Sequence, residues 1–407
     1  MKERIRHFQT LGLGLFVHYG LYSLLGAGEW VWKLGQRGDY DSLPGQFRPA
    51  PDWADTLCRQ ARLAGCRYVT LTVRHHDGFS LYDTCGLSDY DAMQAMGRDL
   101  AREFVDACRA NGLVPFFYHT LLDWHHPRYQ TDFPGYLREL REGISLLCRN
   151  YGPIGGFWFD GMWDKPQENW QEDELYATIR QYQPQAILIN NTGLNAQGVP
   201  GHPELDSVTF ERGNPRLVSG QLASEMCQVM GDHWGYAAWD LHFKSPASLI
   251  TDLAQCRRYG ANLLLNVGPL PDGTLRPLEQ GYLELLGVWT SAFRQAIYQP
   301  VPSAIRLPGK NFLLHDDTAY YLFCHDIPMS ADPNVTLPAE TARISFPFPP
   351  IRSAVWLDDG SPVDFTSADG QLTLLPKPYP YGRNLVVRVA RILPDAPVPE
   401  PMPDLPG

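Results

Sequence analysis

Short apolar runs of strand length alternate with amphipathic stretches of helix length over the first 300 residues. The runs are rich in β-branched and aromatic residues, whereas the longer stretches repeat their apolar residues at the helical period. Strands are expected at 13–20, 68–74, 113–120, 155–161, 186–191, 207–211, about 226–236 and 261–273. Helices are expected at 51–65, 99–112, 136–150, 172–183, 245–260 and about 278–297.

The order of these elements predicts a parallel sheet covered by helices. Strands that are apolar on both faces are typical of such sheets, and the number of β–α units is close to eight. A (β/α)₈ barrel over residues 1–300 is therefore the leading α/β architecture, and an open doubly wound sheet is the alternative. No GxGxxG follows the first strand, which disfavours the alternative.

The pattern changes after residue 300. Helical periodicity disappears, and short alternating runs such as ARISFPF, SAVWLDDG and NLVVRVA are separated by turn residues. This pattern predicts an antiparallel β-sandwich over residues 301–393. The remaining residues, 394–407, are rich in proline, and we assign them no fold.

Charge and cysteine usage narrow the class of protein. The net charge is −11 and no cluster of basic residues is present, which argues against nucleic acid and against an anionic membrane surface. No run of 18 apolar residues occurs, and the N-terminus shows no signal-peptide pattern. Eight scattered cysteines without a CxxC pair are expected to be reduced and mostly buried, as in a cytoplasmic protein. A homo-oligomer is possible.

Polar residues gather where the predicted strands end. In a (β/α)₈ barrel the carboxyl ends of the strands form one face, and that face carries the chemistry. The strand-end residues are His18, Arg74 to Asp77 (with His75 and His76), Tyr118 and His119, Asp160, Asn190 and Asn191, and Glu211. We expect these side chains to converge on one rim.

Asp160 is the strongest candidate for chemistry. Trp158 and Trp163 flank it, and aromatic neighbours that exclude water make a carboxylate more effective toward a developing cation. Such a carboxylate is suited to act as a nucleophile on a sugar carbon. The alternative is a carboxylate that caps a helix or pairs with arginine. Glycoside hydrolysis needs a second acid. Glu211 and Glu225 are the candidates, with ordinary exposed glutamates as the alternative.

The histidines allow two interpretations. His18, His75, His76 and Asp160 could ligate zinc, or the imidazoles could be neutral and form hydrogen bonds with hydroxyl groups. No compact H-x-H or HExxH spacing is present, so hydrogen bonding is the favoured interpretation and no metal is expected.

Several stretches together resemble the retaining α-L-fucosidases of glycoside hydrolase family 29. They are GLFVHYGLYS, GEWVW, RYVTLTVRHHDGFSLYDT, FFYHTLLDW, GFWFDGMW, LDSVTFE, EMCQVMGDHWGY and GANLLLNVGPLPDGTL, in the order of that family. The resemblance implies a barrel followed by a β-sandwich, with Asp160 as the nucleophile that forms a covalent fucosyl-enzyme. It also implies a sugar-binding set, which is His18, Glu29, Trp30, His75, His76, Tyr118, Trp158 and, near the methyl group of the sugar, Trp234.

The resemblance leaves two choices for the acid/base. Glu211 ends DSVTFE, which is similar to a D-x-x-T-x-E stretch of some members. Glu225 lies in SEMC, where the related W-E-x-C motif has Trp in place of Ser224, and Thr192 stands where some members have arginine. We favour Glu211.

The implied function is retaining hydrolysis of a small fucoside or a fucosylated oligosaccharide, without metal or organic cofactor. The alternatives are a non-catalytic fucose-binding protein, a metal-dependent hydrolase on the same barrel, and a hydrolase for a related sugar such as an α-L-galactoside. The natural leaving group and the linkage are not predicted.

Overall fold

A computed structural model describes residues 2–35, 38–218, 221–330 and 342–397. The chain forms two compact units. One comprises Met1–Lys244 and Asn262–Glu284, and the other comprises Ser245–Ala261 and Leu285–Gly407. The domain boundary predicted at residue 300 remains a prediction.

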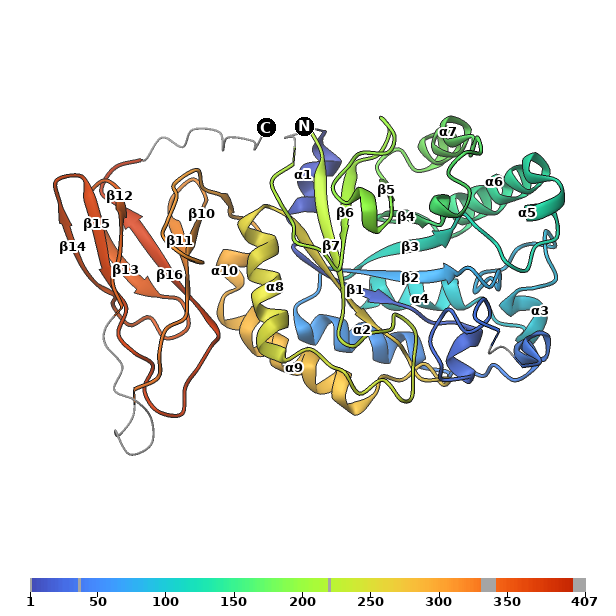
Figure 1. Ribbon diagram of the computed structural model, residues 1–407, viewed down its shortest axis with the longest axis horizontal. Helices are drawn as coiled ribbons and strands as arrows, with labels where there is room; N and C mark the ends of the chain where they lie inside the picture. The colour runs from blue at the N-terminus through green and yellow to red at the C-terminus, as the bar shows by residue number, and fades with distance from the viewer. Residues whose placement is uncertain (1, 36–37, 219–220, 331–341, 398–407) are drawn as a thin grey trace. The chain divides into compact units, whose positions relative to one another are not determined.

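Eight parallel strands of the first unit close into a barrel in sequence order (Figure 1). They are β1 (Leu13–Val17), β2 (Tyr68–Arg74), β3 (Val114–Thr120), β4 (Gly156–Asp160), β5 (Ile187–Asn190), β6 (Ser207–Glu211), β7 (Ala223–Val229) and β8 (Asn262–Val267). The first strand pairs with both β2 and β8, which closes the ring. This confirms the predicted barrel and excludes the open doubly wound sheet.

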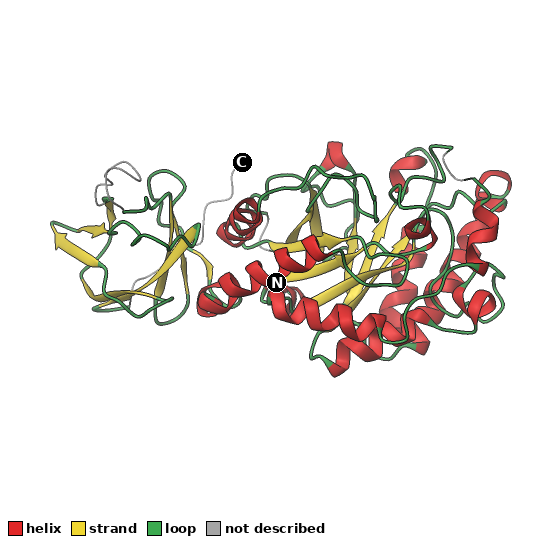
Figure 2. Ribbon diagram, turned by 90° about the horizontal axis from the view of Figure 1, so that it is seen from below, coloured by secondary structure: helices red, strands yellow, loops and turns green. Residues whose placement is uncertain are grey.

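Helices flank the strands of this unit (Figure 2). They are α1 (Glu3–Gln9), α2 (Trp53–Ala64), α3 (Ala92–Met96), α4 (Leu100–Ala110), α5 (Arg128–Thr131), α6 (Phe133–Asn150), α7 (Glu172–Tyr182) and the start of α9 (Pro277–Ala292), with short 3₁₀ helices η1 (Leu21–Leu24), η2 (Tyr40–Gly45), η3 (Met162–Asp164) and η4 (Leu194–Ala196). The helix expected at 136–150 begins three residues earlier, because Asp132 caps it by accepting a hydrogen bond from Gly135 N. The helices α1, α3 and α5 were not predicted, since such short elements show no full period.

Aromatic side chains fill the N-terminal end of the barrel. Ile5 and Phe8 of α1 join the interior cluster, and the Phe8 ring lies 5.6 Å from the rings of both Tyr68 and Phe116. The Tyr68 ring occupies the space beside Gly14, where an added Cβ would lie 2.3 Å from it. These side chains therefore fill the barrel interior at the end opposite to the strand ends where the polar residues gather.

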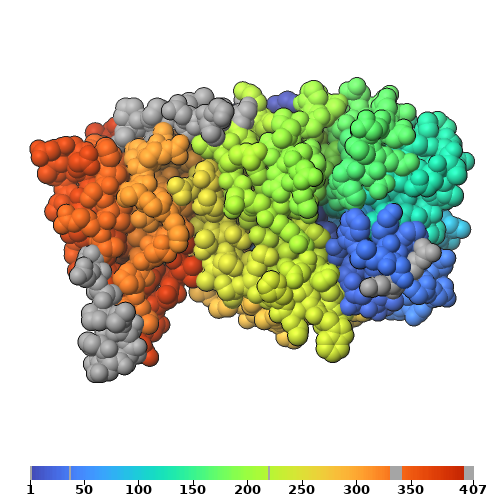
Figure 3. Space-filling view, in the orientation of Figure 1, coloured from blue at the N-terminus to red at the C-terminus, as the bar shows by residue number. Residues whose placement is uncertain are grey.

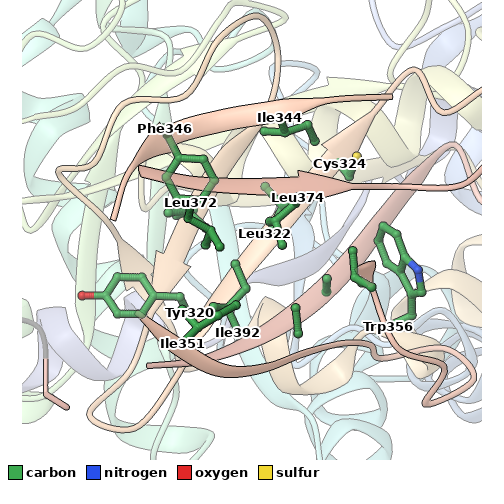
Figure 4. Close-up of a cluster of buried hydrophobic side chains, with 14 of the residues drawn as sticks. Tyr320, Leu322, Cys324, Ile344, Phe346, Ile351, Trp356, Leu372, Leu374 and Ile392 are labelled. Carbon is green, nitrogen blue, oxygen red and sulfur yellow. The ribbon is translucent and has the colours of Figure 1, made fainter. Parts of the chain in front are cut away.

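The second unit contains two antiparallel sheets, as predicted for a β-sandwich. The strand order is β13-β16-β11-β10-β9 in one sheet and β12-β15-β14 in the other. The strands are β9 (Val301–Pro302), β10 (Phe312–His315), β11 (Tyr320–His325), β12 (Ile344–Pro347), β13 (Ile351–Trp356), β14 (Asp364–Ala368), β15 (Gln371–Leu375) and β16 (Val387–Pro394). Residues from both sheets, including Leu322, Phe346, Trp356 and Leu372, form one buried cluster (Figure 4).

The second unit also holds α8 (Pro246–Arg258), the end of α9, and α10 (Arg294–Ile297). Residues 398–407 of the proline-rich segment lie outside the described residues. All eight cysteines are free and only Cys85 among them is exposed, which confirms the expectation that the thiols are mostly buried. Within the described residues, every helix is too short or too polar to cross a bilayer.

Candidate active site

A cavity of about 390 Å³ opens where the barrel strands end. Residues from most of the strand ends line it, as the strand-end argument predicted. They are Phe16, His18, Trp30, His75, His76, Tyr118, Trp158, Asp160, Trp163, Asn191, Thr192, Gly193, Leu194, Asn195, Glu211 and Trp234. Nine of the eleven predicted site residues are therefore brought together, whereas Glu29 and Glu225 do not line the cavity.

The Asp160 carboxylate at the end of β4 accepts hydrogen bonds at both oxygens. Its Oδ1 accepts from the backbone N–H of Gly161 and from the Trp163 indole, both at 2.9 Å. The Asn191 amide also donates to Oδ1, at 3.3 Å. The Tyr118 hydroxyl donates to Oδ2 at 3.1 Å. These contacts fix the orientation of the carboxylate at the cavity wall.

The same contacts keep Asp160 ionised despite its burial. Burial on its own raises the pKa of a carboxyl group. Here three neighbours outweigh the effect of burial: the His76 ring, whose Nε2 lies 3.5 Å from Asp160 Oδ2, and the donors of Trp163 and Tyr118. The pKa of Asp160 therefore lies below its ordinary 3.8. Asp160 is therefore a carboxylate near neutral pH, as a nucleophile must be.

Glu211 at the end of β6 faces the same cavity and shares a donor with Asp160. The Asn191 Nδ2 group donates to Glu211 Oε2 at 2.8 Å and to Asp160 Oδ1 at 3.3 Å. Burial and the negative charge of Asp160 raise the pKa of Glu211 above its ordinary 4.5, and the Asn191 hydrogen bond opposes this only in part. Two neighbouring carboxyl groups whose pKa values are pushed in opposite directions have the pattern of a nucleophile and a general acid.

Glu225, the other acid candidate, lies inside the barrel below the cavity. In β7, Glu225 pairs with Thr209 of β6, which precedes Glu211 by two residues. The Trp158 indole donates to Glu225 Oε1 at 2.9 Å, and the Tyr68 hydroxyl donates to Oε2. Burial raises the pKa of Glu225 to about 7 in spite of these two donors. Since both oxygens bond to core side chains and neither lines the cavity, the geometry favours Glu211.

A buried amide fixes the tautomer of His18. The Asn266 Nδ2 group donates to the Trp234 carbonyl at 2.7 Å, so its Oδ1 faces His18 Nδ1 at 2.6 Å and accepts from it. Burial lowers the pKa of His18 to about 3, and the ring is therefore neutral. Its Nε2 is left as an acceptor, which suits a sugar hydroxyl and supports the hydrogen-bonding interpretation.

Glu29 acts on the site through a neighbour. Its buried carboxylate accepts from the backbone N–H groups of Trp234 at 3.1 Å and Gly235 at 2.8 Å. The Trp234 ring, half-buried, lines the cavity with its centroid 5.1 Å from that of His18. Glu29 therefore holds the segment that carries Trp234.

Tryptophans form one side of the cavity mouth. The Trp30 and Trp163 rings are stacked with centroids 5.8 Å apart, and Trp30 also contacts Trp124 at 5.1 Å. The blue segment that follows β1 lies beside the teal segment that follows β3 on the surface (Figure 3), in agreement with that contact. On the cavity floor, Trp158 stacks on Tyr118 with centroids 5.6 Å apart.

The hypothetical zinc set is not assembled. Within the described residues, no group of three or more His, Cys, Asp or Glu side chains is arranged to hold a metal ion. Asn266 occupies one nitrogen of His18, and the Thr120 hydroxyl lies 2.6 Å from Nδ1 of His76. Overnight treatment of the protein with a chelator remains the solution test of the metal-dependent alternative.

Sequence reasoning missed part of the lining. Asn191 follows β5 directly, so its strand-end position was a usable signal, yet it was not selected as a site residue. Trp163 was noted only as a neighbour of Asp160. Thr192 was noted only because some members of the resembled family have arginine at that position. Gly193, Leu194 and Asn195 had no signal of their own, because their position depends on a loop conformation.

Comparison with known proteins is consistent with this geometry. Residues 2–295 match the family Alpha-L-fucosidase. Tissue alpha-L-fucosidase of Bos taurus is 28% identical over 331 residues, which is 72% of this chain and 69% of that protein. The solved structure of alpha-L-fucosidase isoenzyme 1 from Paenibacillus thiaminolyticus has a TM-score of 0.81 and 27% identity, covering 96% of this chain and 98% of that one.

A third similar protein is the GH29 alpha-L-fucosidase of Bacteroides thetaiotaomicron, solved as a trapped covalent intermediate with 2-fluoro-fucosyl fluoride. Its TM-score is 0.81 at 20% identity, with 96% of each chain covered. At that identity the likeness shows the fold.

Proposed function

Because this chain belongs to the alpha-L-fucosidase family of glycoside hydrolases, we propose that it hydrolyses α-L-fucosides with retention of configuration through a covalent intermediate on Asp160. The observation that carries the proposal is the shared hydrogen-bond donor, Asn191, between Asp160 and Glu211. It brings the two acids that glycoside hydrolysis requires to one side of one cavity.

The separation of the two acids supports retention. Since one nitrogen bonds to both, Asp160 Oδ1 and Glu211 Oε2 are at most about 6 Å apart. Retaining glycosidases hold their two carboxyl groups about 5–5.5 Å apart, whereas inverting enzymes need about 6.5–9.5 Å to admit a water molecule. The upper limit for this pair of oxygens lies below the inverting range, which supports retention.

The proposed reaction has two steps. In the first, the Asp160 carboxylate attacks C1 of the sugar, the bond from C1 to the leaving oxygen breaks, and Glu211 gives its proton to that oxygen. In the second, the Glu211 carboxylate takes a proton from water, the water oxygen attacks C1, and the bond to Asp160 breaks. Two inversions release fucose with its original configuration and restore both side chains.

The remaining lining residues suit a deoxysugar. His18 Nε2 is an acceptor for a hydroxyl hydrogen, since Nδ1 is bound to Asn266. Trp158 and Trp234 present apolar ring surface, which suits the C–H face and the methyl group of fucose. His75 and His76 lie side by side with centroids 4.2 Å apart and add further hydrogen-bonding atoms to the same cavity.

The test is Asp160→Ala on an aryl α-L-fucoside. Turnover should fall by at least about 10⁴-fold, and azide should restore part of it by occupying the space of the lost carboxylate and attacking C1. Full activity in the variant would remove Asp160 from this role. Fucose binding by calorimetry without any turnover in the wild type would favour the non-catalytic fucose-binding alternative.

A further inference from the structure

The cavity mouth has an apolar surface that the proposed mechanism does not use. Leu194 lines the cavity yet is 63% exposed, and Trp163 is 37% exposed. Both are large apolar side chains at the edge of a polar site. Exposing such groups to water is unfavourable, so they are candidates for contact with a bound molecule.

The position of the acids shows which part of a substrate meets this surface. The bond that breaks must lie between Asp160 and Glu211, and both acids bond to Asn191. The next residues along the chain, Thr192 to Asn195, line the same cavity toward its mouth. A group that leaves C1 beside Glu211 therefore passes over this segment.

Trp163 and the 192–195 segment meet at this point. Gly193 has φ +84°, and a Cβ added to it would lie 3.8 Å from Cδ1 of Trp163, so the two residues lie close together and little space separates them. Stacking on Trp30 and the hydrogen bond from its indole to Asp160 fix the Trp163 ring. A ring held at one face and one edge leaves a rigid apolar surface for a ligand, which costs little entropy on binding.

The charge of the cavity limits what this surface can accept. Of the residues that line the cavity in the described part of the chain, Asp160 and Glu211 carry carboxyl groups and none is Lys or Arg. An anionic leaving group would therefore meet negative charge in the lining itself, because the Arg212 guanidinium lies outside the lining, 5.4 Å from the centroid of the Trp234 ring. A neutral group fits this environment.

We propose that Trp163, Gly193 and Leu194 form a leaving-group subsite for a neutral aglycone with a flat apolar face. An aryl ring and the C–H face of a pyranose ring share this chemistry. The inference rests on the proposed function and adds to it the class of fucoside that is cleaved best. It assigns Leu194 a role in specificity, distinct from the residues that hold the fucose ring.

The test variant is Leu194→Asn, with Leu241→Asn as the matched control. Leu241 is 81% exposed and does not line the cavity, so the control repeats the same chemical change elsewhere. Three substrates are compared by kcat/KM: 4-nitrophenyl α-L-fucoside, a fucosyl-N-acetylglucosamine disaccharide, and fucosyl fluoride, whose leaving group has no ring to contact the subsite.

Leu194→Asn should lower kcat/KM about fivefold on at least one ring-bearing substrate and less than about twofold on fucosyl fluoride. The ring-bearing substrate that is affected identifies the aglycone as aryl or sugar. Equal losses on all three substrates, or no loss on either ring-bearing substrate, would overturn the subsite. Turnover of fucosyl fluoride by the wild type tests the proposed function independently, because that reaction does not need the subsite.

Discussion

Replacing Glu225 by Gln removes an ionisable group from the barrel interior while keeping the shape of the side chain. Burial raises the pKa of Glu225 from 4.5 to about 7 in the folded protein. The folded state therefore holds the proton more tightly than the unfolded state does. By linkage, the wild type loses stability as pH rises from the unfolded value of 4.5 through about 7.

The size of this loss follows from the shift. Each pKa unit corresponds to about 1.4 kcal/mol, so the full shift amounts to about 3 kcal/mol above pH 7. Glu225→Gln does not titrate and escapes that loss. The difference in unfolding free energy, variant minus wild type, should therefore move by about 3 kcal/mol in favour of the variant between pH 4.5 and pH 8. Other titrating groups are common to both proteins and cancel.

Urea unfolding of both proteins at the two pH values measures this difference directly. Glu168→Gln, at an exposed glutamate, is the matched control. The Glu225→Gln variant should keep most of its activity on fucosides with poor leaving groups, because Glu211 supplies the proton. An unfolding difference that is the same at both pH values would refute the reasoning about burial. A large loss confined to poor leaving groups would instead make Glu225 the acid.

Three further predictions concern the site and its support. Activity should have a bell-shaped pH dependence, because it requires ionised Asp160, whose pKa is lowered, and protonated Glu211, whose pKa is raised. Glu211→Gln should abolish the fall in activity on the alkaline side. An alkaline fall that persists in this variant would contradict the assignment of Glu211 as the acid. Trp163→Phe keeps the ring but removes the donor to Asp160, and kcat/KM on fucosyl fluoride should fall about tenfold; an unchanged value would show that the contact is dispensable. Asp123→Asn leaves the Arg74 guanidinium without its buried partner and should cost about 3 kcal/mol in urea unfolding, whereas less than about 1 kcal/mol would contradict a structural role for the pair.

The sequence was most informative where a local pattern determines position. Strands apolar on both faces predicted the barrel, and the strand-end rule then placed His76, Asp160 and Glu211 on one rim, because the carboxyl ends of parallel strands share a face. Glu225 could not be separated from Glu211 in this way. Its depth depends on the register of β7 against β6, which pairs it with Thr209 and is set by contacts between distant strands.

Other residues depend on loop conformation or act indirectly. Leu194 lines the cavity only because of how the segment after β5 folds back against Trp163. Glu29 affects the site through backbone groups of Trp234 and Gly235, a contact between residues about 200 positions apart in the chain. No periodicity or spacing in the sequence reports such contacts, so the structure was needed to find them.

The central claim is that Asp160 forms a covalent bond to the sugar. Incubation with 2-fluoro-fucosyl fluoride, followed by mass spectrometry of the intact protein and of its peptides, tests it most directly, since the fluorine slows breakdown of the intermediate. We predict one added 2-fluoro-fucosyl group per chain, located on Asp160 in the peptide that contains GFWFDGMW. A label on another residue, or release of 2-fluoro-fucose with inverted configuration and no label, would contradict the account.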